Sequence, residues 1–345
     1  MARPRPGPGR ERRPVLAGTG RPRRRLVAVT AEHRSDRVTV LAGGVGGARL
    51  AHGLDLAGAD LTVVVNVADD VELHGLWISP DLDTVTYTLA GLADEERGWG
   101  VVGETYAALD AMGRLGEDTW FTLGDRDLAT HVVRTARLRA GASLADVTAQ
   151  LTSALGVRAR VLPVTDDRVA TLVDTPAGRL GFQEYFVGRR HADDVLGLVY
   201  DGIDAARPAP GVLDAVTDAD VVVVAPSNPF LSVEPVLGVA GVREALAGTT
   251  ARRVAVSPIV GGRALKGPAA QILTTLGHEV SALGVARLYV GLVDVMVIDD
   301  HDAHLADAVR ALGMDVVVTD TVMGGAPGRE RLAREVLRAG GASRG

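Results

Sequence analysis

Residues 38–49 read VTVLAGGVGGAR, a β-branched run followed by four glycines within five positions. The run 38–42 is apolar throughout, as is typical of a buried strand in a parallel sheet. The glycines predict a turn at which the backbone can approach a phosphate closely, and a helix over residues 49–54 would direct free N–H groups at that anion. The four positions are Gly43, Gly44, Gly46 and Gly47.

This glycine segment differs from two common phosphate-binding motifs. The dinucleotide fingerprint requires a third Gly or Ala at the position of Arg49, and a Walker A loop ends in Gly-Lys-Ser/Thr. The pattern is therefore also compatible with a tight connection between a strand and a helix that binds no ligand.

The composition excludes several classes of protein. Hydrophobic residues make up 47% of the 345 positions, but aromatic residues contribute only 3%, so Val, Leu and Ala must fill the core. The lack of cysteine excludes disulfides, thiolate catalysis and Cys-ligated zinc or iron–sulfur sites. No apolar stretch reaches the ~18 residues of a membrane span, and we expect a soluble, cytoplasmic protein without a membrane partner.

Charge is distributed unevenly along the chain. Residues 1–37 contain 11 arginines and three acidic residues, which leaves 26 basic and 40 acidic side chains over the other 308 positions. So acidic a segment lacks the basic surface that nucleic-acid binding uses, and no nucleic-acid partner is expected. An acidic enzyme acting on phosphates is instead expected to bind divalent metal. Residues 1–37, rich in Arg and Pro, predict a disordered tail without a role.

Strand-like and helix-like runs alternate after the glycine segment. Strands are expected at residues 61–67, 220–225, 253–257, 293–298 and 315–319, with helices between them such as 268–276 and 304–312. This order predicts an α/β fold, a Rossmann-like three-layer parallel sheet in one domain over residues 38–345. Residues 95–200 break the alternation and predict an inserted, mainly helical subdomain with a hairpin.

Polar side chains follow several of the predicted strands. The second strand leads to Asn66, Asp69 and Asp70, and later strands lead to PSNP at 226–229 and to SPIVGG at 257–262. Ligands of open parallel sheets bind beyond the carboxyl ends of the strands, so these segments together predict a site. Each one alone is also ordinary turn composition.

Two segments carry paired acidic residues at predicted helix starts. In SPDLDT, residues 79–84, Asp81 and Asp83 are separated by one residue, and in an extended loop we expect one of them to be a ligand and the other a structural cap. Either is also an ordinary N-cap of the following helix. In LGDRDLAT, residues 123–130, Asp127 is expected to cap a helix while Arg126 points into a cleft as an anion or polar-ligand contact.

These segments together resemble one enzyme family. SPDLDT and LGDRDLAT are the most specific, and the other matching stretches follow in the same order along the chain. They are TVLAGGVGGARL (39–50), VVNVADD (64–70), HGL (74–76), GWG (98–100), LPVTDD (162–167), APSNP (225–229) and SPIVG (257–261). The chain is similar to the 2-phospho-L-lactate transferases, in particular to their bacterial form, the phosphoenolpyruvate transferases of coenzyme F-420 biosynthesis.

The resemblance implies a reaction. The donor would be enolpyruvyl-diphospho-guanosine or lactyl-diphospho-guanosine, and the acceptor the terminal ribityl hydroxyl of 7,8-didemethyl-8-hydroxy-5-deazariboflavin. Transfer would give dehydro coenzyme F-420-0, or coenzyme F-420-0, and release GMP. The resemblance also implies Mg²⁺ as cofactor and a homodimer.

Roles for individual residues are likewise implied by the resemblance. Asp83 would be catalytic and would contact the deazaflavin together with Arg126, where archaeal relatives commonly have Lys. The metal ligands would come from Asp83, Asp69 and Asp70, although spacing leaves open which aspartates of these two segments bind it. The guanosine diphosphate part would lie against Gly43, Gly44, Gly46, Gly47, Asn66, Ser227, Asn228, Ser257 and Gly261.

Two other functions are compatible with parts of the sequence. The gluconeogenesis-factor family, which binds nucleotide sugars as a regulator, shares a related glycine turn and a Ser/Asn/Pro loop, but SPDLDT and LGDRDLAT argue against it. A nicotinamide oxidoreductase lacks support because the third glycine is missing and Asn66, rather than an acidic residue, ends the second strand.

Overall fold

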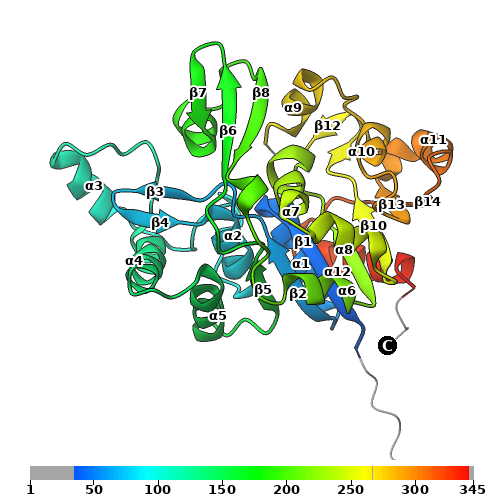
Figure 1. Ribbon diagram of the computed structural model, residues 1–345, viewed down its shortest axis with the longest axis horizontal. Helices are drawn as coiled ribbons and strands as arrows, with labels where there is room; N and C mark the ends of the chain where they lie inside the picture. The colour runs from blue at the N-terminus through cyan, green and yellow to red at the C-terminus, as the bar shows by residue number, and fades with distance from the viewer. Residues whose placement is uncertain (1–34, 266, 342–345) are drawn as a thin grey trace, which may run out of the picture. The chain divides into compact units, whose positions relative to one another are not determined.

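A seven-stranded parallel sheet lies at the centre of the chain (Figure 1). The computed structural model describes residues 35–265 and 267–341, so residues 1–34 of the predicted tail lie outside the described residues. The strand order is β14-β13-β10-β9-β1-β2-β5, and all neighbouring pairs are parallel. The strands are β1 (Arg37–Ala42), β2 (Asp60–Val65), β5 (Arg160–Pro163), β9 (Val221–Val224), β10 (Arg252–Val256), β13 (Val295–Ile298) and β14 (Asp315–Val318). The predicted parallel α/β sheet is confirmed.

Helices cover both faces of this sheet, as its continuously apolar strands require. In Figure 1, α6 (Val212–Thr217), α7 (Glu234–Gly238) and α8 (Val242–Gly248) lie in front of the strands, and α1 (Gly44–Leu56) and α12 (Gly325–Ala339) lie behind them. α1 also packs against α2 (Pro80–Leu89). The predicted three layers are therefore present.

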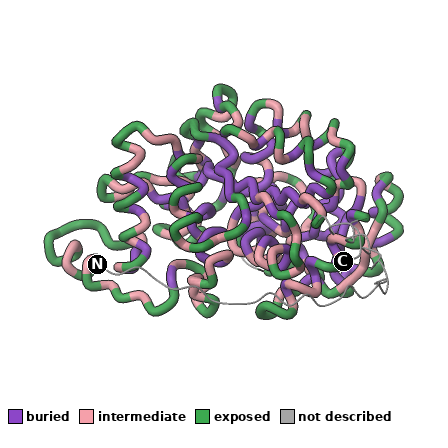
Figure 2. Tube along the Cα trace, turned by 90° about the horizontal axis from the view of Figure 1, so that it is seen from below, coloured by how far each residue is buried: buried purple, intermediate pink, exposed green. Residues whose placement is uncertain are grey.

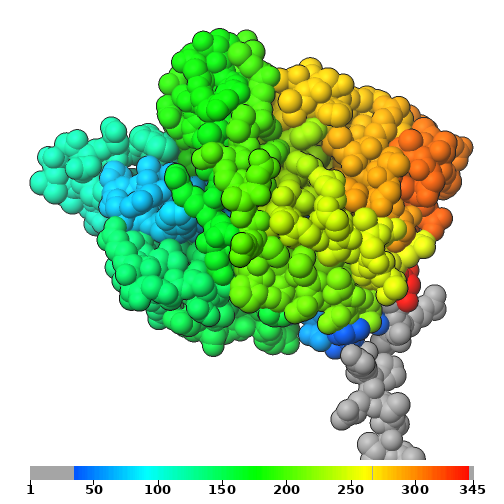
Figure 3. Space-filling view, in the orientation of Figure 1, coloured from blue at the N-terminus to red at the C-terminus, as the bar shows by residue number. Residues whose placement is uncertain are grey.

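The core is built largely from valine, as the scarcity of aromatic residues predicts. β9 consists of four valines, each at most 1% exposed. Figure 2 shows the buried residues gathered along the middle of the described trace, and the space-filling view in Figure 3 shows little of β1 at the surface. In the described part of the chain, no helix is both long and apolar enough to cross a membrane.

Residues 95–200, the expected insertion, surround one strand of the central sheet. Three helices precede β5, and a separate antiparallel sheet in the order β7-β6-β8 follows it. The predicted hairpin is present as β6 and β7, and Ser143 caps α5 as expected, its Oγ accepting from Asp146 N at 3.0 Å. The elements are α3 (Ala107–Arg114), α4 (Asp125–Arg139), α5 (Leu144–Ala154), β6 (Ala170–Thr175), β7 (Gly178–Gly181) and β8 (Gly197–Asp201).

Short elements connect these units. Four of them pair into two small antiparallel hairpins, β3 with β4 and β11 with β12. Their bounds are β3 (Val71–Leu73), β4 (Leu76–Ile78), β11 (Ile259–Val260) and β12 (Arg263–Ala264). The remaining α-helices are α9 (Ala269–Thr275), α10 (Ala282–Leu288) and α11 (Ala306–Arg310). Short π-helical or 3-10 segments are η1 (Glu184–Gly188), η2 (Ile203–Ala205), η3 (Pro229–Val233) and η4 (Asp300–Leu305).

The glycine segment is helical rather than a turn before a helix. α1 begins at Gly44, five residues earlier than predicted, because its glycines allow close packing. A Cβ at Gly46 would overlap the carbonyl oxygen of Pro226, and one at Gly47 would lie 2.8 Å from the Cβ of Ala42. The first turn of α1 therefore rests directly on the backbone after β9 and on β1.

Replacing Gly46 tests this packing. We expect Gly46→Ala to lower the free energy of unfolding by about 1–3 kcal/mol, since overpacking against backbone forces the helix to shift. Gly248→Ala is the matched control, because Gly248 also lies in a helix and a Cβ there would meet nothing within 4 Å. Urea denaturation measures both changes, and equal stability of the two variants would contradict the packing role.

Candidate active site

Three of the predicted nucleotide-binding residues meet where β1, β2 and β9 end. The Ser227 hydroxyl donates to the Gly43 carbonyl at 2.8 Å, and the same hydroxyl oxygen accepts from the Gly43 N–H at 3.3 Å. The Asn66 amide donates to the Leu231 carbonyl at 3.2 Å. The carboxyl ends of neighbouring parallel strands thus bring Gly43, Asn66 and Ser227 together, as the sequence predicts.

Asp81 lies at the N-terminus of α1, where the sequence predicts an anion. Its carboxylate accepts from the Gly44 N–H at 2.7 Å and from the Asn66 amide at 3.0 Å. Burial raises the pKa of Asp81, and the hydrogen bonds from Asn66 and from the helix N-terminus at Gly44 offset part of that effect. The sequence leaves Asp81 open as a helix cap or as a metal ligand, and the N-cap residue of α2 is Ser79. The position of Asp81 in the SPDLDT segment is the sequence signal that points to this contact.

Asp69 and Asp70 follow β2, and the charge of Asp81 acts on Asp69. Asp70 Oδ2 accepts from the Ser79 hydroxyl at 2.6 Å and from the Trp77 indole at 3.0 Å. The Oδ1 atoms of Asp69 and Asp70 are buried without a hydrogen-bond partner among the described residues. We call Asp69, Asp70 and Asp81 the acidic cluster.

No ion pair joins a carboxylate of the acidic cluster to a cation among the described residues, although the charge of Arg134 acts on Asp70. Burial raises the pKa of Asp70 from 3.8 to about 8, against the hydrogen bonds from Ser79 and Trp77. Burial, together with the charges of Asp81 and Asp70, raises the pKa of Asp69 well above its usual range. Buried carboxylates with free oxygens are the ligands that a divalent cation requires.

Asp83 faces the opposite side of α2. Both of its carboxylate oxygens contact the guanidinium of Arg134 on α4, with Nη1 3.0 Å from Oδ2. Arg134 is only 2% exposed and Asp83 only 6%. Because α2 is helical, two aspartates separated by one residue point to different neighbours. The extended loop considered from the sequence is therefore absent, and Asp81 rather than Asp83 contacts the glycine segment.

His131 and Asp127 extend this second group of polar side chains. Asp127 Oδ1 accepts from the Tyr87 hydroxyl at 2.7 Å and lies 3.2 Å from His131 Nε2. Asp83, Asp127 and His131 each offer one ligand atom within 4.8 Å of the others, an arrangement that could hold a metal ion. Arg134 already supplies positive charge there, in contrast to the acidic cluster. We call Asp83, Asp127, His131 and Arg134 the Arg134 cluster.

Arg126 and the start of α4 differ from the expectation. Asp127 does not cap α4; Glu104 from the preceding loop accepts from the N–H groups of Arg126 and Asp127 at 2.8 and 2.9 Å. The exposed Arg126 guanidinium donates to the Val102 carbonyl at 2.8 Å. Among the described residues it makes no hydrogen bond or ion pair with Asp83, so its deazaflavin contact stays a prediction.

The remaining predicted residues stabilise loops at the same edge of the sheet. Asn228 Oδ1 accepts from the Phe230 N–H at 3.0 Å, and Ser257 Oγ accepts from the Ile259 N–H at 3.1 Å. The Gly261 N–H donates to Asp302 Oδ2 at 3.0 Å. The first two contacts are local and the third joins residues 41 positions apart. The nucleotide-binding roles of Asn228, Ser257 and Gly261 stay predictions.

A double-mutant cycle tests whether Arg134 and Asp83 compensate each other. Arg134→Met should cost about 3–5 kcal/mol of stability, because it leaves a buried carboxylate unpaired. Asp83→Asn combined with Arg134→Met should recover part of that loss. Urea denaturation of both single variants and the double variant gives the coupling. Strictly additive losses would contradict a direct ion pair.

The pKa of Asp70 predicts a pH-dependent stability. Between pH 4 and about pH 8 the folded protein binds a proton at Asp70 that the unfolded chain releases, so stability falls as pH rises through this range. In chelator, Asp70→Asn should remove that part of the decline in the thermal midpoint. Asp60→Asn, at the exposed start of β2, is the control. Parallel pH profiles for wild type and Asp70→Asn would contradict the raised pKa.

Comparison with known proteins identifies the family. Residues 38–337 match the family described as 2-phospho-L-lactate transferase CofD. A phosphoenolpyruvate transferase of Streptomyces griseus is 43% identical, covering 87% of this chain and 97% of its own, and a 2-phospho-L-lactate transferase of Methanosarcina mazei is 39% identical, covering 87% and 99%. A crystal structure of a UPF0052 family protein from Bacillus halodurans shares the fold, with a TM-score of 0.58 at 17% identity over 88% of this chain and 99% of that one. The chain belongs to the 2-phospho-L-lactate transferase family.

Proposed function

We propose that the protein transfers a phosphoenolpyruvyl or phospholactyl group from the corresponding guanosine diphosphate ester to the deazaflavin 7,8-didemethyl-8-hydroxy-5-deazariboflavin. The products are dehydro coenzyme F-420-0, or coenzyme F-420-0, and GMP. The observation that carries this proposal is the match to phosphoenolpyruvate transferases along nearly their whole length, at 43% identity for the Streptomyces griseus enzyme. The enolpyruvyl donor is favoured because that relative is named a phosphoenolpyruvate transferase.

The guanosine diphosphate part is assigned to the edge of the sheet around the glycine segment. The free N–H groups of the first turn of α1 and the helix dipole favour an anion there. The residues assigned to it are Gly43, Gly44, Gly46, Gly47, Asn66, Ser227, Asn228, Ser257 and Gly261. Asp81 occupies the Gly44 N–H, so the diphosphate is expected to share this end of the helix with that carboxylate.

The acidic cluster fits a Mg²⁺ ion better than the Arg134 cluster does. Magnesium prefers carboxylate oxygens, and the buried Oδ1 atoms of Asp69 and Asp70 have no other partner among the described residues. Asp83, the third proposed ligand, already binds Arg134 through both oxygens. Asp69 and Asp70 would therefore hold the ion, and bound Mg²⁺ would neutralise charge on the diphosphate.

Asp83 is proposed as the residue that accepts the proton of the acceptor hydroxyl. A carboxylate has about four lone-pair sites, and Arg134 uses two of them, so the hydroxyl can bind the others. The oxygen of the acceptor hydroxyl forms a bond to the phosphorus that bears the three-carbon acid. The bond from that phosphorus to the bridging oxygen breaks, and GMP leaves with that oxygen. Such transfer relies on positioning and charge neutralisation and needs no covalent nucleophile.

The proposal extends to the setting of the enzyme. Small-molecule substrates are its partners, with Arg126 as a further deazaflavin contact. We propose a homodimer in the cytoplasm that binds neither nucleic acid nor membrane. The acidic balance of residues 38–345 supports the first of these exclusions.

Product analysis tests the function directly. Protein incubated with the deazaflavin, Mg²⁺ and each candidate donor should form a product heavier by one phospho-acid unit, with one GMP per product, as measured by mass spectrometry. No product with the enolpyruvyl, lactyl or glyceryl donor would overturn the proposal. Binding of a UDP-sugar in such an inactive protein would favour the nucleotide-sugar-binding regulator instead.

Asp83→Asn separates the catalytic role of Asp83 from a structural one. We expect turnover to fall by about 10²-fold or more, because an amide cannot accept the proton. Asp60→Asn, at the exposed amino end of β2, should leave turnover unchanged. Unchanged turnover of Asp83→Asn at an unchanged thermal midpoint would remove Asp83 from the reaction.

A further inference from the structure

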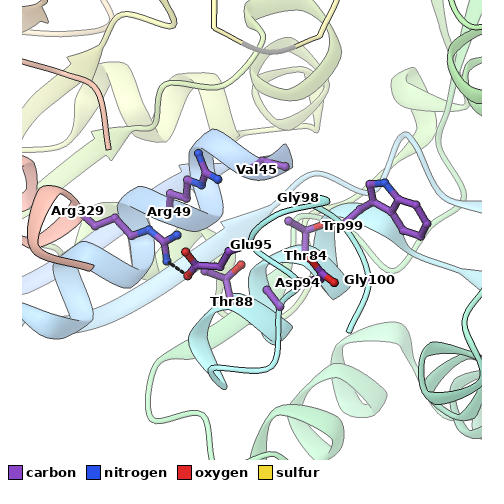
Figure 4. Close-up of a pocket in the computed structure, with 11 residues that line it drawn as sticks. Val45, Arg49, Thr84, Thr88, Asp94, Glu95, Gly98, Trp99, Gly100 and Arg329 are labelled. Atoms are coloured by element: carbon purple, nitrogen blue, oxygen red, sulfur yellow. Dashed lines mark ion pairs between the residues drawn. The ribbon is translucent and has the colours of Figure 1, made fainter. Parts of the chain in front are cut away.

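A pocket beside the first turns of α1 and α2 is lined by two arginines, Arg49 and Arg329 (Figure 4). Val45 and Arg49 line it from one face of α1, and Thr84 and Thr88 line it from α2. Arg329 of α12 closes its inner end. The segment over residues 93–100 forms the outer rim and contributes Trp99, a residue that is 43% exposed.

Arg329 is a buried cation with an unused donor. It is only 2% exposed, and its Nε has no hydrogen-bond partner among the described residues. Its Nη1 lies 2.9 Å from Glu95 Oε1 and 3.1 Å from His52 Nδ1. Glu95 lies on the rim with 56% of its side chain exposed, so solvent competes for its pairing with Arg329.

Arg49 lies near Arg329 without an anion of its own. Within the described ranges it has no hydrogen bond and no ion pair. Burial and the charge of Arg329 lower the pKa of Arg49, and both effects also lower the pKa of His52, which favours the neutral imidazole. The other acidic residue of the pocket, Asp94, is held by Arg97 at 2.7 Å. Arg329 therefore pairs with one solvent-exposed carboxylate, and Arg49 pairs with none among the described residues.

We propose that Arg49 and Arg329 form a subsite that binds the carboxylate of the three-carbon acid on the donor. This inference rests on the proposed function. Val45 lies in the first turn of α1, at the proposed diphosphate site, and Arg49 is one helical turn further along the same face. Side chains of a helix lean toward its N-terminus, so the Arg49 guanidinium extends toward the diphosphate end of the pocket.

The chemistry of the pocket matches a carboxylate attached to a phosphate. Guanidinium groups bind carboxylates through two parallel hydrogen bonds, and Arg49 and the Nε of Arg329 both have free donors. The Thr84 and Thr88 hydroxyls supply further donors on the facing wall. A donor whose acid enters this pocket would displace Glu95 from Arg329 and supply the missing negative charge.

Arg49→Gln tests the subsite, because Arg49 is only partly buried and its loss should leave the fold intact. We expect the KM for the enolpyruvyl donor to rise about tenfold or more, the loss typical of one charge-assisted hydrogen bond. The KM for the deazaflavin and the Kd for GDP, which lacks the acid, should stay within twofold. Arg49→Lys should recover part of the loss, and Arg334→Gln, an exposed arginine on α12, is the matched control.

Three outcomes would overturn the subsite. An equal rise in the Kd for GDP would place Arg49 on the diphosphate, a rise only in the KM for the deazaflavin would place the acceptor in this pocket, and unchanged constants would leave the arginines without a ligand.

Calorimetry with phosphoenolpyruvate and with inorganic phosphate keeps the test independent of turnover. Phosphoenolpyruvate should bind wild type more tightly than phosphate does and should lose this advantage in Arg49→Gln. Equal binding of both would make the pocket a phosphate site and contradict the proposal. If wild type binds phosphoenolpyruvate as expected but transfers nothing, the transferase proposal fails while the subsite stands.

Discussion

The hydrogen bond from the Gly44 N–H to Asp81 joins the two segments on which the site depends. It places the first turn of α2 against the first turn of α1, at the edge where β1 and β2 end. This contact requires glycine at position 43, because a Cβ there would lie 2.6 Å from Asp81 Oδ2. The glycine segment therefore allows the backbone to pack closely against other backbone and against the Asp81 carboxylate, and it leaves the same close approach open to a phosphate.

The first turn of α2 separates two kinds of acidic environment. Asp81 belongs to the acidic cluster with Asp69 and Asp70, where the charge of Arg134 acts on Asp70 but no carboxylate forms an ion pair among the described residues. Asp83, on the other side of the helix, is neutralised by Arg134. A protein gains nothing in stability from burying uncompensated carboxylates, so the acidic cluster is best explained by a ligand that carries positive charge. The Arg134 cluster, in contrast, holds one carboxylate ionised and oriented.

Much of the fold could be predicted from residues 38–42 and the later apolar runs, because strands buried on both faces leave a continuous hydrophobic signal. The start of α1 could not, since glycine is a poor helix former and only packing against Pro226 and Ala42 explains its helical conformation. β5 was missed because its four residues, RVLP, include a proline at the sheet edge. For the site, motif spacing identified segments that the fold brings into contact, such as the glycine segment and SPDLDT. It could not show that Asp81 and Asp83 face different partners, or that Glu104 rather than Asp127 caps α4, because both depend on neighbours distant in sequence.

The position of the bound metal tests the central claim most directly. Anomalous diffraction from crystals of the protein soaked with Mn²⁺, which favours the same oxygen ligands as Mg²⁺, locates the ion without reference to turnover. A peak bonded to the carboxylates of Asp69 and Asp70 is the predicted result. A peak bonded instead to Asp83, Asp127 and His131, with Asp69 and Asp70 free of metal, would contradict the assignment of the acidic cluster as the cation site.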